Sequence, residues 1–194
     1  DMKVNGVTVG RGSGTVVTNT SVGLNSLNSN TTGSSNTSLG YTALRDNLTA
    51  SNNTAVGHSA LITSTGGNNT AIGQSAGNTL TTGVNNVLIG YNAQPSSPDV
   101  SNEVTIGNND VTKTRLKGEV QTTQDITVNG MTVGADEGLK NTYLGKNALS
   151  SATNGMFVTA VGEDALKNSA DGGAYNTAVG YNAGGDLTSG SGNT

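Results

Sequence analysis

Hydrophobic residues recur along this chain at a fixed interval within a largely polar background. An aliphatic residue followed directly by glycine returns about every 17 residues. The glycines of this pattern are Gly23, Gly40, Gly57, Gly73, Gly90, Gly107, Gly145, Gly162 and Gly180. A fixed period is the sequence signature of repeat architectures, and one this short is typical of a β-solenoid turn rather than of a helical hairpin. The pattern therefore predicts an all-β solenoid or β-roll with about 17 residues per coil.

The repeated phrase has its fullest form, Asn-Thr-Ala-Val-Gly-Tyr-Asn-Ala, between Asn176 and Ala183. Thr, Val and Tyr favour strands, whereas Asn and Gly favour corners. The third residue after each glycine is small, which indicates a tight interior. These small residues are Ser26, Ala43, Ala60, Ala76, Ala93, Ala148, Ala165 and Ala183. Each phrase thus predicts one short strand followed by one tight corner.

Two columns of the repeat are expected to carry the structure. The glycine column has no exception among the copies, which indicates a corner with positive φ or a close backbone approach from a neighbouring coil. The residue before each glycine is always aliphatic, and we expect this column to point inwards and to stack coil upon coil. Its members are Val22, Leu39, Val56, Ile72, Ile89, Ile106, Leu144, Val161 and Val179.

A second, longer repeat divides the chain. The segment Val4-Asn-Gly-Val-Thr-Val-Gly10 returns as Val128-Asn-Gly-Met-Thr-Val-Gly134. We expect a β-rich opening over residues 1–18 and solenoid coils over 19–94. A collar or linker with the second opening follows over 95–140, and a second, truncated solenoid segment over 141–194. The part from Val104 to Val133 has looser alternation, which fits a β-rich collar or, alternatively, a flexible linker. Because the second solenoid segment is cut short, we expect the chain to be a segment of a longer one.

The composition argues against other kinds of structure and against several partners. The chain has 29 Gly, one Phe and no Trp, and its 11% charged residues fall well below the roughly 25% of ordinary soluble domains. One large globular core is therefore not expected. A disordered linker is the rival, but a net charge of −4 and periodic Val, Ile and Leu favour order. The acidic balance disfavours nucleic acid as a partner, and no apolar run predicts membrane insertion.

The sequence contains no pattern of residues that indicates catalysis or metal binding. The single histidine, His58, occupies a column that also holds Tyr, Gln, Lys and Glu, which is typical of a solvent-facing position. One His and no Cys cannot supply a zinc site of normal ligand count within one chain. No Asp or Glu recurs in each turn, as calcium-binding solenoids require. We therefore expect no catalytic, cofactor-binding or metal-binding residues and no enzyme activity, and the receptor-binding residues stay unknown.

The repeated phrase, with linkers such as Thr-Gly-Ser-Ser-Asn-Thr37, resembles the repeats of bacteriophage tail fibres, notably of marine and cyanobacterial phages. It is also similar to the head repeats of trimeric autotransporter adhesins, which form trimeric β-rolls. The resemblance implies a homotrimeric, extracellular shaft of the virion that holds a distal receptor-binding tip. Its partners would be its own copies, other tail proteins, and a host surface glycan or protein. Exposed Tyr41, Tyr91 and Tyr181 are available for weak glycan contacts.

Two other functions stay open. The passenger or stalk of a bacterial trimeric adhesin would carry the same repeats on a cell surface. An ice-binding solenoid is suggested by a threonine column, although its threonines are single rather than paired as Thr-x-Thr. This column comprises Thr20, Thr37, Thr54, Thr70, Thr142, Thr159 and Thr177.

Overall fold

The computed structural model describes residues 1–118, 120, 122, 126–128, 131–136, 140–151, 156–168 and 174–194. Within these residues the secondary structure consists of strands and turns without a helix. Successive strands stack about 17 residues apart, so the expected all-β solenoid is confirmed. The chain divides into two compact units, Asp1–Arg115 and Leu116–Thr194.

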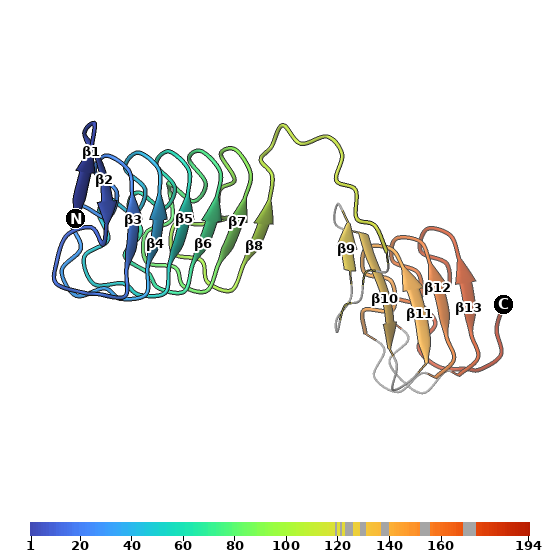
Figure 1. Ribbon diagram of the computed structural model, residues 1–194. Coiled ribbons are helices and arrows are strands. Elements are labelled where there is room, and N and C mark those ends of the chain that lie inside the picture. Colours follow the sequence, from blue (N-terminus) through green and yellow to red (C-terminus); the bar gives the residue numbers. More distant parts are fainter. Residues whose placement is uncertain are drawn as a thin grey trace. The chain divides into compact units, whose positions relative to one another are not determined.

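The first unit is one eight-stranded sheet that a hairpin opens (Figure 1). Strands β1 (Met2–Val4) and β2 (Val7–Gly10) pair antiparallel, and β2 pairs antiparallel with β3. From β3 onwards all pairs are parallel and follow chain order. The parallel strands are β3 (Thr20–Val22), β4 (Thr37–Leu39), β5 (Thr54–Val56), β6 (Thr70–Ile72), β7 (Val87–Ile89) and β8 (Val104–Ile106).

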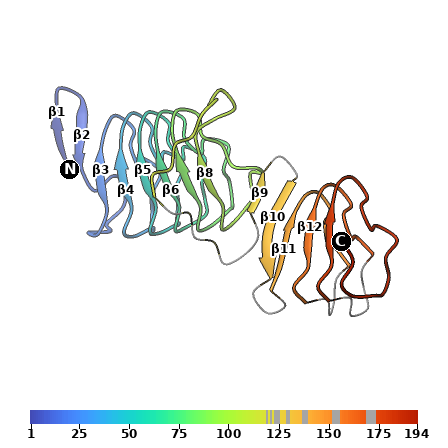
Figure 2. The same ribbon diagram turned by 90° about the vertical axis from the view of Figure 1, so that its right-hand side faces the viewer.

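The second unit has the same plan in five strands (Figure 2). Strands β9 (Ile126–Val128) and β10 (Met131–Asp136) form the opening hairpin, and β10 pairs antiparallel with β11 (Asn141–Leu144). Strands β12 (Thr159–Val161) and β13 (Thr177–Val179) then add in parallel. The longer sequence repeat therefore marks a hairpin that covers the first edge of each parallel sheet, an edge that would otherwise be open to pairing.

Residues 95–140, the expected collar, are divided between the two sheets. Strand β8 is the last rung of the first sheet, whereas β9 and β10 belong to the second. Several positions of the expected collar lie outside the described residues, namely 119, 121, 123–125, 129–130 and 137–139.

The core of each coil is narrow and is filled by three columns. Successive residues of a strand point to opposite faces, so only the middle residue of each three-residue strand faces inwards. Around these middle residues lie the predicted small column and a column of leucines. The inward strand residues include Ser21, Ser38, Ala55, Ala71, Leu88, Ala160 and Ala178, and the leucines are Leu27, Leu44, Leu61, Leu149 and Leu166, all of them buried. The buried Ala43, Ala60, Ala76, Ala93, Ala148 and Ala165 confirm that the small column marks a tight interior.

The aliphatic column does not point inwards, so that expectation was wrong. Leu39, Ile72 and Ile89 are 46%, 42% and 38% exposed. The reason is strand alternation: the residue before the glycine lies two positions after the threonine, so both face outwards when the middle residue faces the core. The column does stack, because the strand register aligns Val22, Leu39, Val56, Ile72, Ile89 and Ile106 in one file.

Two successive coils exchange core residues in a compensating way. Gly77, in the coil of β6, stands where five coils have leucine, and Leu88, in the next coil, stands where most coils have alanine or serine. A Cβ atom on Gly77 would lie 2.8 Å from Leu88 Cδ1 and 2.9 Å from Leu61 Cδ2. The Leu88 side chain therefore fills the space that a leucine at position 77 would take.

This exchange predicts that the effects of substitutions at positions 77 and 88 on stability are coupled. Leu88→Ala alone should lower the free energy of unfolding by about 2–4 kcal/mol, the usual cost of a buried leucine-sized cavity. Gly77→Leu alone should also destabilise the unit, because the new side chain meets Leu88. The double variant restores the ordinary pair seen at Leu61 and Ala71, so it should recover most of both losses in urea unfolding. Simple addition of the two single effects would contradict this packing.

Candidate functional site: the outward sheet face and the glycine groove

The glycine column combines both features expected of it. Gly23, Gly40, Gly57 and Gly73 have φ between 136° and 149°, where residues with a Cβ are strained. A Cβ atom on each of them would also lie 2.2–2.4 Å from the carbonyl oxygen of the next glycine in the column. Gly145 and Gly162 show the same close approach in the second unit. The absent side chains thus let neighbouring coils meet backbone to backbone.

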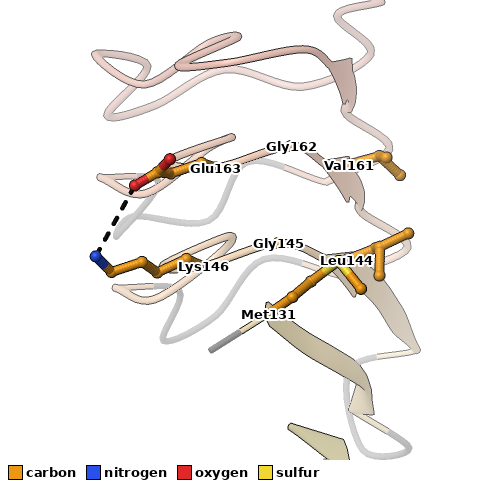
Figure 3. A pocket seen from close by; sticks show the side chains of 7 residues that line it. All are labelled: Met131, Leu144, Gly145, Lys146, Val161, Gly162 and Glu163. Atoms are coloured by element: carbon orange, nitrogen blue, oxygen red, sulfur yellow. Dashed lines mark ion pairs between the residues drawn. The ribbon is translucent and has the colours of Figure 1, made fainter. Parts of the chain in front are cut away.

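In the second unit, Gly145 and Gly162 form the floor of a groove on the outward sheet face, and the glycines of the first unit occupy the equivalent positions of the repeat. The aliphatic column forms one wall, and the residues that follow each glycine form the other. This groove is an open pocket of about 560 Å³, and Met131 also lines it. Figure 3 shows Leu144 and Val161 on one side of the glycine backbone and Lys146 and Glu163 on the other. We call this the glycine groove, and we call the aliphatic column beside it the aliphatic ridge.

Apart from Leu24, the residues that follow the column glycines are aromatic or polar, and most of them are exposed. The rings of Tyr41 and His58 stack with centroids 5.2 Å apart and planes inclined by 19°. Lys146 Nζ and Glu163 Oε1 lie 4.0 Å apart, a distance at which exposed charges contribute little. His58 is solvent-facing in its variable column, as expected. Tyr91 and Tyr181, which occupy the same column, are also exposed.

Electrostatics elsewhere on the surface are local. Arg45 donates two hydrogen bonds of 2.7 Å to the carboxylate of its neighbour Asp46, which lowers the pKa of Asp46. The pKa of Asp164 is lowered by hydrogen bonds from Asn147 and Lys167. Over the described part of the chain, no three His, Cys, Asp or Glu side chains gather where they could hold a metal ion.

A buried ladder of asparagines was missed by the sequence interpretation, which assigned Asn to corners. The Oδ1 atom of each ladder residue accepts a hydrogen bond of 2.9 Å from the backbone N–H of the ladder position one coil on. In most coils the Nδ2 atom donates to a corner carbonyl at 2.8–3.0 Å. The ladder comprises Asn19, Asn36, Asn53, Asn69, Asn86, Asn141 and Asn176. The sequence did contain a signal for this ladder, namely the asparagine at the first position of most copies of the repeated phrase.

A second buried column changes from polar to apolar along the first unit. It runs through Asn30, Asn47, Ser64 and Leu80. Asn47 Nδ2 donates to Asn30 Oδ1 at 3.2 Å, but Asn47 Oδ1 has no partner among the described residues. This column therefore does not continue as a ladder.

The asparagine ladder of the first unit ends in a carboxylate. Glu103 N–H donates to Asn86 Oδ1 at 2.9 Å, and the Glu103 side chain accepts hydrogen bonds from the Ser96 hydroxyl, the Ser96 N–H and the Thr105 hydroxyl. The Ser96 hydroxyl bond is the largest cause of a lowered Glu103 pKa. Glu103 therefore joins the last strand to the turn after Ala93.

This carboxylate should make the end of the first unit sensitive to acid. A carboxyl whose folded pKa is lowered stabilises the fold above its ordinary pKa of 4.5, and this contribution is lost as the pH falls through the folded value. Glu103→Gln should therefore speed hydrogen exchange of peptides covering β8 at pH 7, after correction for the intrinsic rate. The difference from the native chain should shrink at pH 3. An equal difference at both pH values would contradict a role for the charge.

In comparisons with known proteins, no family model, no curated protein and no solved structure matches this chain. Among the described residues, no helix is long and apolar enough to cross a membrane.

Proposed function

We propose that this chain is part of the shaft of a phage tail fibre, a rod that holds a distal receptor-binding tip away from the virion. The observation that supports it best is the uninterrupted joining of coils. From β3 to β8, each coil is joined to the next by backbone pairing and by a hydrogen bond to an Oδ1 atom of the asparagine ladder. Such a structure is quasi-one-dimensional, because each coil contacts only its neighbours. It suits mechanical extension and the presentation of several tips at once.

The outward sheet face supports assembly of several chains, and we propose a homotrimer. Each coil has a small interior, so a single chain buries little apolar area per coil. At the same time the aliphatic ridge leaves Leu39, Ile72, Ile106 and Val179 between 42% and 70% exposed. Exposed apolar surface in a continuous strip is typical of an interaction surface. Association of copies would remove this strip from water.

The proposal is tested by locating the chain in its source. Antibodies raised against residues 1–194 would be used for immunogold electron microscopy of virions and of bacterial cells. Label along tail fibres is the expected result. Label on bacterial surfaces without label on virions would overturn the tail-fibre role in favour of an adhesin stalk. Thermal hysteresis by the purified chain, with neither structure labelled, would instead favour ice binding.

A further inference from the structure

We propose that copies of this chain associate by packing the aliphatic ridge of one copy into the glycine groove of the next. The inference deepens the proposed function, on which it rests, by naming the surface through which the chains of the shaft meet. It also gives a second reason for the glycine column. The glycines allow close approach between coils of one chain, and they leave an open channel for side chains of another.

The arrangement of ridge and groove permits closure into a ring. Both run side by side along the same sheet face of one chain, as Leu144, Gly145 and Lys146 illustrate in Figure 3. A copy can therefore offer its ridge to one neighbour and its groove to another. Such a head-to-tail contact forms a closed ring when the rotation between copies completes a circle. Three copies around one axis satisfy this condition.

The repeat distance of the side chains indicates that a second copy of the chain fills the glycine groove. Ridge side chains and groove glycines both repeat once per strand, and adjacent strands lie about 4.8 Å apart. The register aligns the ridge without an offset from β3 to β8, and each glycine from Gly23 to Gly73 lies against the next glycine of the column. A partner can fill every position of the groove only if its own side chains repeat at that distance. The aliphatic ridge of a second, parallel copy has this repeat, because its strands are spaced at the same distance.

The charges on this face agree with burial between copies. The face consists of the outward strand residues, the glycines and the residues that follow them. Among its described residues the only ionic side chains are Lys146 and Glu163, which have opposite signs and pair with each other. Depletion of charge together with exposed aliphatic and aromatic residues is typical of the core of a protein–protein interface. An anionic or cationic partner would find little to bind here.

Cysteine cross-linking tests which columns meet. The chain has no cysteine, so Ile72→Cys on the ridge and Gln74→Cys on the groove wall can be introduced singly. The two variants, carrying different tags, would be co-expressed and oxidised mildly. Ridge-into-groove packing predicts a mixed disulfide between position 72 of one chain and position 74 of another, because a disulfide requires Cβ atoms within about 4.5 Å. Disulfides between two 72 positions without any mixed 72-to-74 product would mean that ridges meet only each other, and this result would overturn the proposal.

Charge substitution provides an independent measurement. Ile72→Glu should weaken self-association at least about 100-fold in sedimentation experiments, because a carboxylate in an apolar contact is strongly unfavourable. Val84→Glu is the matched control. Val84 is a similarly exposed β-branched residue outside the ridge, at 40% against 42% for Ile72. Circular dichroism would verify that both variants keep the native strand content.

The outcomes separate this inference from the proposed function. If the native chain assembles and Ile72→Glu behaves like Val84→Glu, the surface is wrong, whereas labelling of tail fibres would still support the shaft role. If the native chain stays monomeric at all concentrations tested, self-association through this face is overturned. If cross-links and charge sensitivity agree but labelling appears only on bacteria, the contact stands and the tail-fibre role fails.

Discussion

Gly57→Ala should lower the free energy of unfolding by at least about 3 kcal/mol, combining left-handed backbone strain with overpacking. Gly57 has φ of 139°, and a Cβ atom there would lie 2.3 Å from the Gly73 carbonyl oxygen and 2.5 Å from its carbonyl carbon. The neighbouring atoms belong to the backbone, so no side-chain rotation can relieve the clash. Two coils must separate, which disrupts the pairing of β5 with β6.

Gly6→Ala is the matched control for this change. Gly6 also has a positive φ, 83°, but no atom lies within 4 Å of its Cβ position. Its substitution should therefore cost only the backbone strain, about 1 kcal/mol. Urea unfolding followed by circular dichroism would compare the two variants. Equal losses would show that backbone conformation alone, and not contact between coils, explains the glycine column.

Asn53→Ala should lower the free energy of unfolding by about 3–4 kcal/mol, because two buried backbone groups lose their partners. Asn53 Oδ1 accepts from the Asn69 N–H at 2.9 Å, and Asn53 Nδ2 donates to the Gly66 carbonyl at 3.0 Å. Asn53 and Asn69 are completely buried. Water therefore cannot replace either bond without opening the coil.

Asn68→Gly serves as the control for the asparagine ladder. Asn68 is exposed, and its side chain accepts only a surface hydrogen bond from Asn52. Its φ of 60° suits glycine, so the substitution should change stability by less than about 1 kcal/mol. The same urea titration would measure both variants. A loss for Asn53→Ala no greater than that for Asn68→Gly would contradict a structural role for the ladder.

The solenoid and its period could be predicted because they depend on spacing alone. The glycine column has no exception, and within each unit the structure aligns its glycines from coil to coil with positive φ. The hairpin that opens each sheet could likewise be expected from the Val-Asn-Gly repeat. Spacing says where coils begin, but it does not say which way a side chain points.

The orientation of the aliphatic residues shows that limit. In the phrase Thr-Ala-Val, a three-residue strand can place either Ala or the pair Thr and Val inside. Greater hydrophobicity favoured Val56 and its equivalents for the core, but the structure buries Ala55 instead. The exchange of Gly77 with Leu88 was a signal in the sequence, because only residues that share one small interior would compensate in this way.

The asparagine ladder could not be recognised from one coil. A buried asparagine is stable only if its amide has partners, and here a main partner of each residue is the backbone of the next coil, 16 or 17 positions along the chain. Asparagine is equally common at corners, so composition alone did not separate the two roles. The ladder follows only once the register between coils is known.

Cryo-electron microscopy of the purified chain tests the central claim most directly. We predict a rod with rungs about 4.8 Å apart along its axis. Its cross-section should contain three solenoids, each with its aliphatic ridge seated over the glycines of its neighbour. Single solenoids with the aliphatic ridge facing solvent, or particles whose glycines do not align from rung to rung, would contradict the account.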